Sequence, residues 1–76
     1  MKYLRKGIYR HYKGKLYEVL GTARHSETLE EHVVYKALYR TRYGAASLWI
    51  RPKTMFNSRV TVNGRAVKRF QYHGTK

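Results

Sequence analysis

Cysteine is absent from this chain of 76 residues, and proline occurs once. Without cysteine there is no disulfide framework and no thiolate-ligated zinc, and the composition suits a reducing compartment. No apolar run approaches the roughly 18 residues of a membrane-spanning helix, and the first residues hold no apolar stretch typical of a signal peptide. We therefore expect one small cytoplasmic domain over residues 1–76, ordered over about 7–72, with no membrane partner.

Acidic residues are scarce and unevenly placed. Only 4 acids oppose 17 Lys and Arg, for a formal net charge of +13. The acids are Glu18, Glu27, Glu30 and Glu31, so the chain from His32 onward contains none. Self-repulsion on this scale destabilises a small compact domain, and the asymmetry indicates an anionic partner, with nucleic acid as the first candidate.

Residues with catalytic or metal-binding chemistry form no convergent pattern. Ser26 lies between His25 and Glu27, but adjacent residues of one loop rarely face one another as a catalytic triad must. The 4 histidines are spread along the chain with no Cys or Asp nearby to complete a zinc site. We expect a binding protein that is not an enzyme, with no catalytic residues, no cofactor and no metal.

Short β-branched and aromatic runs, separated by turn residues, predict an all-β fold. Lys13-Gly14 and Asn63-Gly64 predict tight hairpin turns, because glycine and asparagine tolerate positive φ. Pro52 begins a helical turn through Phe56, since proline suits the first position of a helix, and Met55 and Phe56 are expected to close one end of the core. The expected strands are 7–12, 15–20, 32–39, 48–51, 59–62 and 65–72, with polar loops at 22–31 and 40–47.

Strands this short leave exposed edges unless the sheet closes on itself. We therefore predict a small five- to six-stranded SH3-like or Tudor-like barrel with one short helical turn. An OB-like barrel is the alternative.

A longer sequence pattern runs through these elements. It comprises GIYRHYKG at 7–14, LYEVLG at 16–21, ARHSETLE at 23–30, VVY at 33–35, ALY at 37–39, LWIRP at 48–52 and MF at 55–56. Over about residues 7–72 the chain resembles a family of small bacterial proteins, domain of unknown function family 1653. The resemblance implies kinship and assigns no activity. Where that family carries acids, this chain has Arg40, Arg42, Lys53 and Arg59, so its strong basicity is expected to be particular to this member.

Basic and aromatic residues alternate in two segments, 39–43 and 49–51. Arginine binds phosphate, and Tyr or Trp rings stack on bases, so this alternation is typical of nucleic-acid binding. Trp49 fits either a stacking surface or the core. The residues expected to bind nucleic acid are Tyr39, Arg40, Arg42, Tyr43, Arg51, Lys53, Arg59, Arg65, Lys68 and Arg69.

The sequence thus favours a non-catalytic protein that recognises the backbone or single strands of DNA or RNA. No amphipathic recognition helix is predicted, which disfavours helical readout of the major groove. The alternative is a protein–protein interaction module, in which Tyr9, Tyr17, Tyr35 and Trp49 form an aromatic groove for a peptide or an acidic partner protein.

Overall fold

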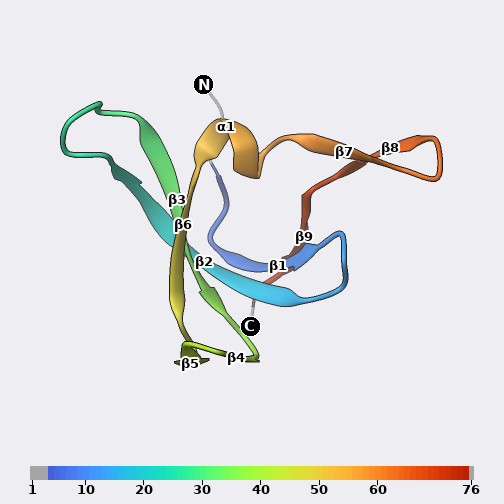
Figure 1. The fold of residues 1–76 in the computed structure, drawn as a ribbon, viewed down its shortest axis with the longest axis horizontal. Coiled ribbons are helices and arrows are strands. Elements are labelled where there is room, and N and C mark those ends of the chain that lie inside the picture. The colour runs from blue at the N-terminus through green and yellow to red at the C-terminus, as the bar shows by residue number, and fades with distance from the viewer. Residues whose placement is uncertain (1–3, 76) are drawn as a thin grey trace.

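A five-stranded antiparallel sheet forms the centre of the molecule in the computed structural model, which describes residues 4–75 (Figure 1). Its strands are β1 (Gly7–His11), β2 (Leu16–Arg24), β3 (Glu31–Ala37), β6 (Leu48–Pro52) and β9 (Phe70–Gly74). They lie in the order β6-β3-β2-β1-β9, so the last strand returns beside the first. The described residues therefore share one central sheet, while residues 1–3 and 76 lie outside the described part of the chain.

Two short ribbons and one helical turn complete the fold. The pair β4 (Arg40–Thr41) and β5 (Gly44–Ala45) lies at the start of β6, and α1 (Lys53–Phe56) lies at its end. The pair β7 (Arg59–Val62) and β8 (Arg65–Lys68) extends away from the central sheet (Figure 1). Its turn has φ of 52° at Asn63 and 76° at Gly64, the positive values predicted for this dipeptide.

The predicted all-β class with one short helical turn is confirmed. The sheet does not close into a barrel, however, because β6 and β9 end it without pairing to each other within residues 4–75. The predicted final strand, 65–72, is in fact two strands that separate at Arg69. Its first half pairs with β7 and its second half with β1, so neither half reaches β6.

The second strand is longer than predicted. It passes through Gly21 and continues to Arg24, with a register shift between Val19 and Gly21. This irregularity allows residues 22–24 to pair with β3, because a bulge absorbs an extra residue without ending the ladder. The expected loop at 22–31 therefore shortens to the turn between β2 and β3.

Aromatic rings dominate the core, whose buried members are Tyr9, Val19, Val33, Tyr35, Phe56 and Phe70. Alternating β3 residues supply Val33 and Tyr35, as expected for a strand with one buried face. Phe56 is 1% exposed and closes the core from α1, as predicted, whereas Met55 is 50% exposed and does not. A four-residue helix has room to direct only one large side chain inward.

Candidate functional site

Two aromatic rings and a guanidinium group are exposed together at the β4–β5 end of the molecule. Tyr43 is 68% exposed and meets Trp49 edge to face, with ring centroids 5.5 Å apart. The guanidinium carbon of Arg42 lies 6.0 Å from the centre of the Tyr43 ring. We call Arg42, Tyr43 and Trp49 the aromatic tip. Trp49 is thus a surface ring and not a core residue, the two placements that the sequence allows.

Hydrogen bonds order the backbone of the aromatic tip and orient the Trp49 indole. The Thr41 hydroxyl accepts from the Tyr43 backbone N–H at 3.0 Å and donates to the Gly44 carbonyl at 3.2 Å. The Trp49 indole N–H donates to the Ser47 hydroxyl at 2.9 Å. Because the Trp49 indole is held by the Ser47 hydroxyl, less conformational freedom of this ring is lost when a ligand stacks on it.

Tyr39 and Arg51 are tied to the interior. The Tyr39 hydroxyl hydrogen-bonds to that of Tyr17, and Lys15 Nζ lies 4.9 Å from the Tyr39 ring centre. Burial raises the pKa of Tyr17, and the bond to Tyr39 raises it further. Arg51 Nε donates to the Tyr35 hydroxyl at 3.2 Å. The structure therefore separates Tyr39 and Arg51 from the freely exposed groups of the aromatic tip, and it adds Lys15 beside Tyr39.

The β7–β8 pair carries most of the remaining predicted cations. Arg59 and Lys68 lie directly opposite each other in the ladder, and Arg65 follows the Asn63-Gly64 turn. Arg69 is partly buried, and its Nε donates to the Ser58 hydroxyl at 3.0 Å. Arg59, Arg65 and Lys68 are exposed and form no ion pair within residues 4–75.

A cavity of about 520 Å³ opens between this ribbon, α1 and the first described residues. We call it the basic pocket, because Arg5, Lys53, Arg59 and Lys68 line it and no acid does among the described residues. The remaining residues of its walls are Leu4, Tyr9, Asn57, Phe70 and Tyr72.

Charge–aromatic contacts order one wall of the basic pocket. The guanidinium carbon of Arg5 lies 4.5 Å from the Tyr72 ring centre, and the Tyr9 hydroxyl donates to the Arg5 carbonyl at 2.8 Å. Burial raises the pKa of Tyr9, so its hydroxyl stays protonated near neutral pH. Lys53 Nζ lies 3.6 Å from a carboxylate oxygen of Glu31, which partly offsets the charge at this edge.

The sequence-based prediction omitted Arg5, Tyr9 and Tyr72 from the nucleic-acid-binding residues, and it assigned Tyr9 to the alternative peptide groove. These residues come from opposite ends of the chain, and the pairing of Tyr9 with Tyr72 across β1 and β9 brings them together. No local spacing signals such a contact. The overall excess of positive charge was the one sequence feature consistent with further cations lying close together.

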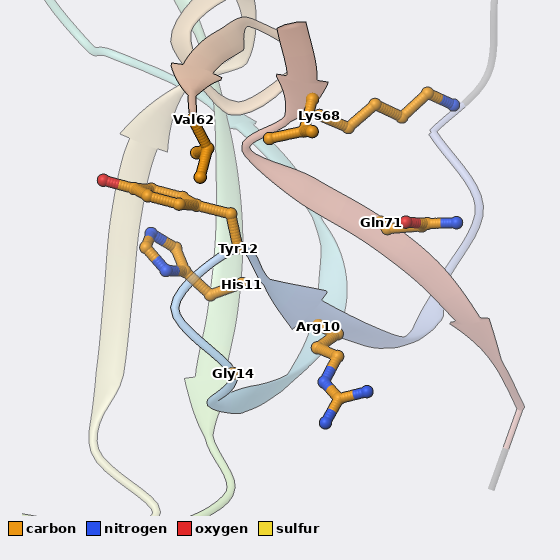
Figure 2. Close-up of a pocket in the computed structure, with 8 residues that line it drawn as sticks. Arg10, His11, Tyr12, Gly14, Val62, Lys68 and Gln71 are labelled. Carbon is orange, nitrogen blue, oxygen red and sulfur yellow. The ribbon is translucent and has the colours of Figure 1, made fainter. Parts of the chain in front are cut away.

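A second cavity, of about 440 Å³, lies between the β1–β2 hairpin and the β7–β8 ribbon. Figure 2 shows Tyr12 and His11 below Val62. Arg10, Gln71 and Lys68 line the cavity to the right of these residues in the same view. Burial lowers the pKa of His11, and the positive charges of Arg51, Arg69 and Lys13 lower it further. Its Nδ1 accepts from the Lys13 backbone N–H at 3.2 Å, so His11 holds the hairpin turn as a neutral ring.

His25 and His32 also form hydrogen bonds with the backbone, around the turn between β2 and β3. His25 Nδ1 accepts from the backbone N–H groups of Glu27 and Thr28, at 3.1 and 3.3 Å. His25 and His32 have ring centroids 6.1 Å apart, yet no group of three or more metal-ligating residues gathers within residues 4–75. In the same part of the chain, no helix is long and apolar enough to cross a membrane.

The aromatic groove of the alternative interpretation does not form on the surface. Tyr9 and Tyr35 are core residues, 6% and 4% exposed, and Tyr17 packs against that core. Trp49 is left with Tyr43 as its exposed neighbour. Any peptide must therefore use another surface of the molecule.

Comparison with known proteins identifies relatives of the whole domain. The family described as "Protein of unknown function (DUF1653)" matches residues 7–72. A crystal structure of a DUF1653 protein from Bordetella bronchiseptica is 41% identical, with a TM-score of 0.85 over 96% of this chain and 91% of that chain. Among curated proteins, none matches the chain significantly. The resemblance predicted from the sequence is confirmed over the same residues.

Proposed function

The chain belongs to the DUF1653 family, and we propose that this member binds nucleic acid without catalysing a reaction. It recognises backbone phosphates and unpaired bases of DNA or RNA. The aromatic tip is the observation that carries this proposal.

The aromatic tip suits a single strand. Tyr43 and Trp49 present ring surface to solvent beside Arg42, and the tip contains no carboxylate that would repel a phosphate. Each base stacked on such a ring contributes about 1–3 kcal/mol, with little dependence on sequence. Arg40 is exposed two residues before Arg42 and adds a second cation at this end of the molecule for contact with phosphate.

The charge distribution supports the same function. The net charge is +13, and the acids Glu18 and Glu31 are already engaged by Lys36 and Lys53. Arg59, Arg65 and Lys68 remain exposed to solvent on the β7–β8 ribbon. A polyanion that neutralises these charges releases counterions, which is the main source of sequence-independent affinity for nucleic acid.

The secondary structure limits the kind of recognition. Within residues 4–75 the one helix is α1, which has 4 residues. It is too short to lie along a major groove as a recognition helix. Contacts to phosphate, shape and unpaired bases therefore account for binding.

A fluorescence-anisotropy titration tests the proposal, using labelled single-stranded and duplex DNA and RNA at four salt concentrations. If six or so cations contact phosphates, the log–log salt slope is about −4 on single strands and about −5 on duplex. Binding weaker than about 10⁻⁴ M at 50 mM salt, below ordinary non-specific association, would refute the proposal.

Binding to an acidic protein or peptide is the second candidate, and the exposed edge strand β6 favours it. Leu48 and Ile50 are 62% and 63% exposed on this strand, whose outer edge has no partner within residues 4–75. Such an edge can accept an additional strand from another chain. Saturable binding to one protein that survives high salt, combined with failure of the nucleic-acid titration, would support this function instead.

A further inference from the structure

Arg59 and Lys68 face each other across the β7–β8 ladder, although both are positively charged. Directly opposite residues of an antiparallel pair have Cβ atoms about 4.5–5.5 Å apart, and like charges in that position destabilise the pair. Neither residue forms an ion pair within residues 4–75. The folded protein thus contains an unrelieved repulsion that a bound anion would remove.

Both residues also line the basic pocket, together with Arg5 and Lys53. These four cations come from separate parts of the chain: the segment before β1, α1, β7 and β8. Asn57 adds an amide that can donate or accept hydrogen bonds. With a volume of about 520 Å³, the cavity falls in the range of small-ligand sites, roughly 300–1,000 Å³.

We propose that the basic pocket binds a phosphate monoester, such as the terminal phosphate of a nucleic-acid strand or the phosphate of a free mononucleotide. In its strand-end form the inference rests on the proposed function, whereas in its mononucleotide form it stands alone. The pocket is a separate site from the aromatic tip, since α1 follows the end of β6, whereas β4, β5 and Trp49 lie near or before the start of β6 (Figure 1).

The charge of the ligand follows from the charge of the site. A phosphate monoester carries about −1.5 to −2 at neutral pH, whereas each internal diester of a strand carries one negative charge. Several cations around one cavity therefore favour the monoester, which can accept hydrogen bonds from Arg59 and Lys68 together. Arginine suits bidentate contact with phosphate oxygens, and lysine adds a compact point charge.

The test compares oligonucleotides of one sequence that carry a phosphate at the 5′ end, at the 3′ end or at neither. One of the phosphorylated strands is expected to bind at least about tenfold tighter than the unphosphorylated strand, as a charge-assisted hydrogen bond implies. A second arm adds adenosine monophosphate, or adenosine as control, at constant ionic strength. The monophosphate should raise the melting temperature more than adenosine does, while both ligands should change Trp49 fluorescence equally, because Trp49 belongs to the aromatic tip and the two ligands carry the same base.

Two charge-matched variants locate the effect. The double substitution Arg59→Gln/Lys68→Gln should abolish the preference for a terminal phosphate and the stabilisation by adenosine monophosphate. Arg40→Gln/Arg42→Gln removes the same charge away from the pocket, so it should weaken all strands while keeping the preference. Without ligand, Arg59→Gln/Lys68→Gln should also melt about 1–5 °C higher than the parent, because the opposed charges are gone.

The outcomes separate the two proposals. If the strands bind but neither a terminal phosphate nor adenosine monophosphate has an effect beyond ionic strength, the pocket inference is wrong and the proposed function stands. If no strand binds but adenosine monophosphate stabilises the parent and not Arg59→Gln/Lys68→Gln, the pocket stands and the proposed function fails. Equal loss of the phosphate preference in both double variants would also overturn the pocket inference.

Discussion

Phe56 and Phe70 stack face to face, with ring centroids 4.1 Å apart and planes 5° from parallel. This contact joins α1 to β9, and both rings meet Tyr35 edge to face at 5.6 Å. The helical turn and the last strand are therefore fixed to the same point of the core. Since residues of both elements line the basic pocket, the stack also determines the shape of that cavity.

Phe56→Ala is expected to lower the free energy of unfolding by about 3–5 kcal/mol, because it removes a fully buried aromatic ring and leaves a cavity. Urea unfolding followed by circular dichroism measures the change. The neighbouring Met55→Ala serves as control, since Met55 is half exposed and its loss should change stability by about 0.5 kcal/mol. Similar effects of the two substitutions would mean that α1 does not anchor the core.

Tyr43→Ala should weaken binding of a single strand by about 1–3 kcal/mol, because one stacking ring is lost. Duplex binding should change less, since paired bases are already stacked on each other. Tyr12→Ala is the matched control, an exposed tyrosine on the β1–β2 hairpin turn far from the aromatic tip in sequence. Anisotropy titrations of both variants check this, and equal losses would argue against stacking at the tip.

Arg40→Gln/Arg42→Gln should flatten the salt dependence of binding by one to two units of log–log slope, because each lost phosphate contact removes about 0.7–0.9 units. Both side chains are exposed, so the melting temperature should stay near that of the parent. An unchanged slope would show that phosphates are contacted elsewhere, with the β7–β8 ribbon as the next surface to vary.

Stability should decrease as the pH falls below about 6.5, the ordinary pKa of histidine. The pKa of His11 is lowered in the folded protein, first by burial and then by Arg51, Arg69 and Lys13. Unfolded chains therefore bind the proton more readily, and the contribution of His11 is lost as the pH falls through its folded pKa. Thermal melts at pH 7.5 and 5 should show a smaller loss for His11→Gln than for the parent. An equal loss would assign the pH dependence to other groups.

Local sequence signals predicted the elements that depend on neighbouring residues. Gly14 and Asn63-Gly64 form the expected hairpin turns. The expected helical turn forms over Lys53–Phe56, but Pro52 is the last residue of β6 and does not begin the turn as predicted. The burial of Phe56 followed from its place in that turn. These features could be predicted because turn conformations and hydrophobic alternation are set within a few residues.

Features that depend on distant pairing could not be predicted in this way. The break at Arg69 arises because β1 competes with β7 for the last segment of the chain, and the sequence contains no local mark of that competition. The same pairing places Arg5 over Tyr72 and creates the basic pocket. Whether Trp49 faced the core or solvent also depended on where the sheet ended, because β6 turned out to be an edge strand.

The pairing of Tyr9 with Tyr72 closes a loop that contains most of the chain. We expect this contact to form late in folding, because distant segments lose more entropy on meeting than neighbouring ones do. The aromatic tip, by contrast, lies within a short stretch between β3 and β6 and needs only local contacts. A molecule that transiently releases β9 would therefore lose the basic pocket first and still present the tip. Hydrogen exchange in β9 would then report the fraction of molecules that present the aromatic tip without the basic pocket.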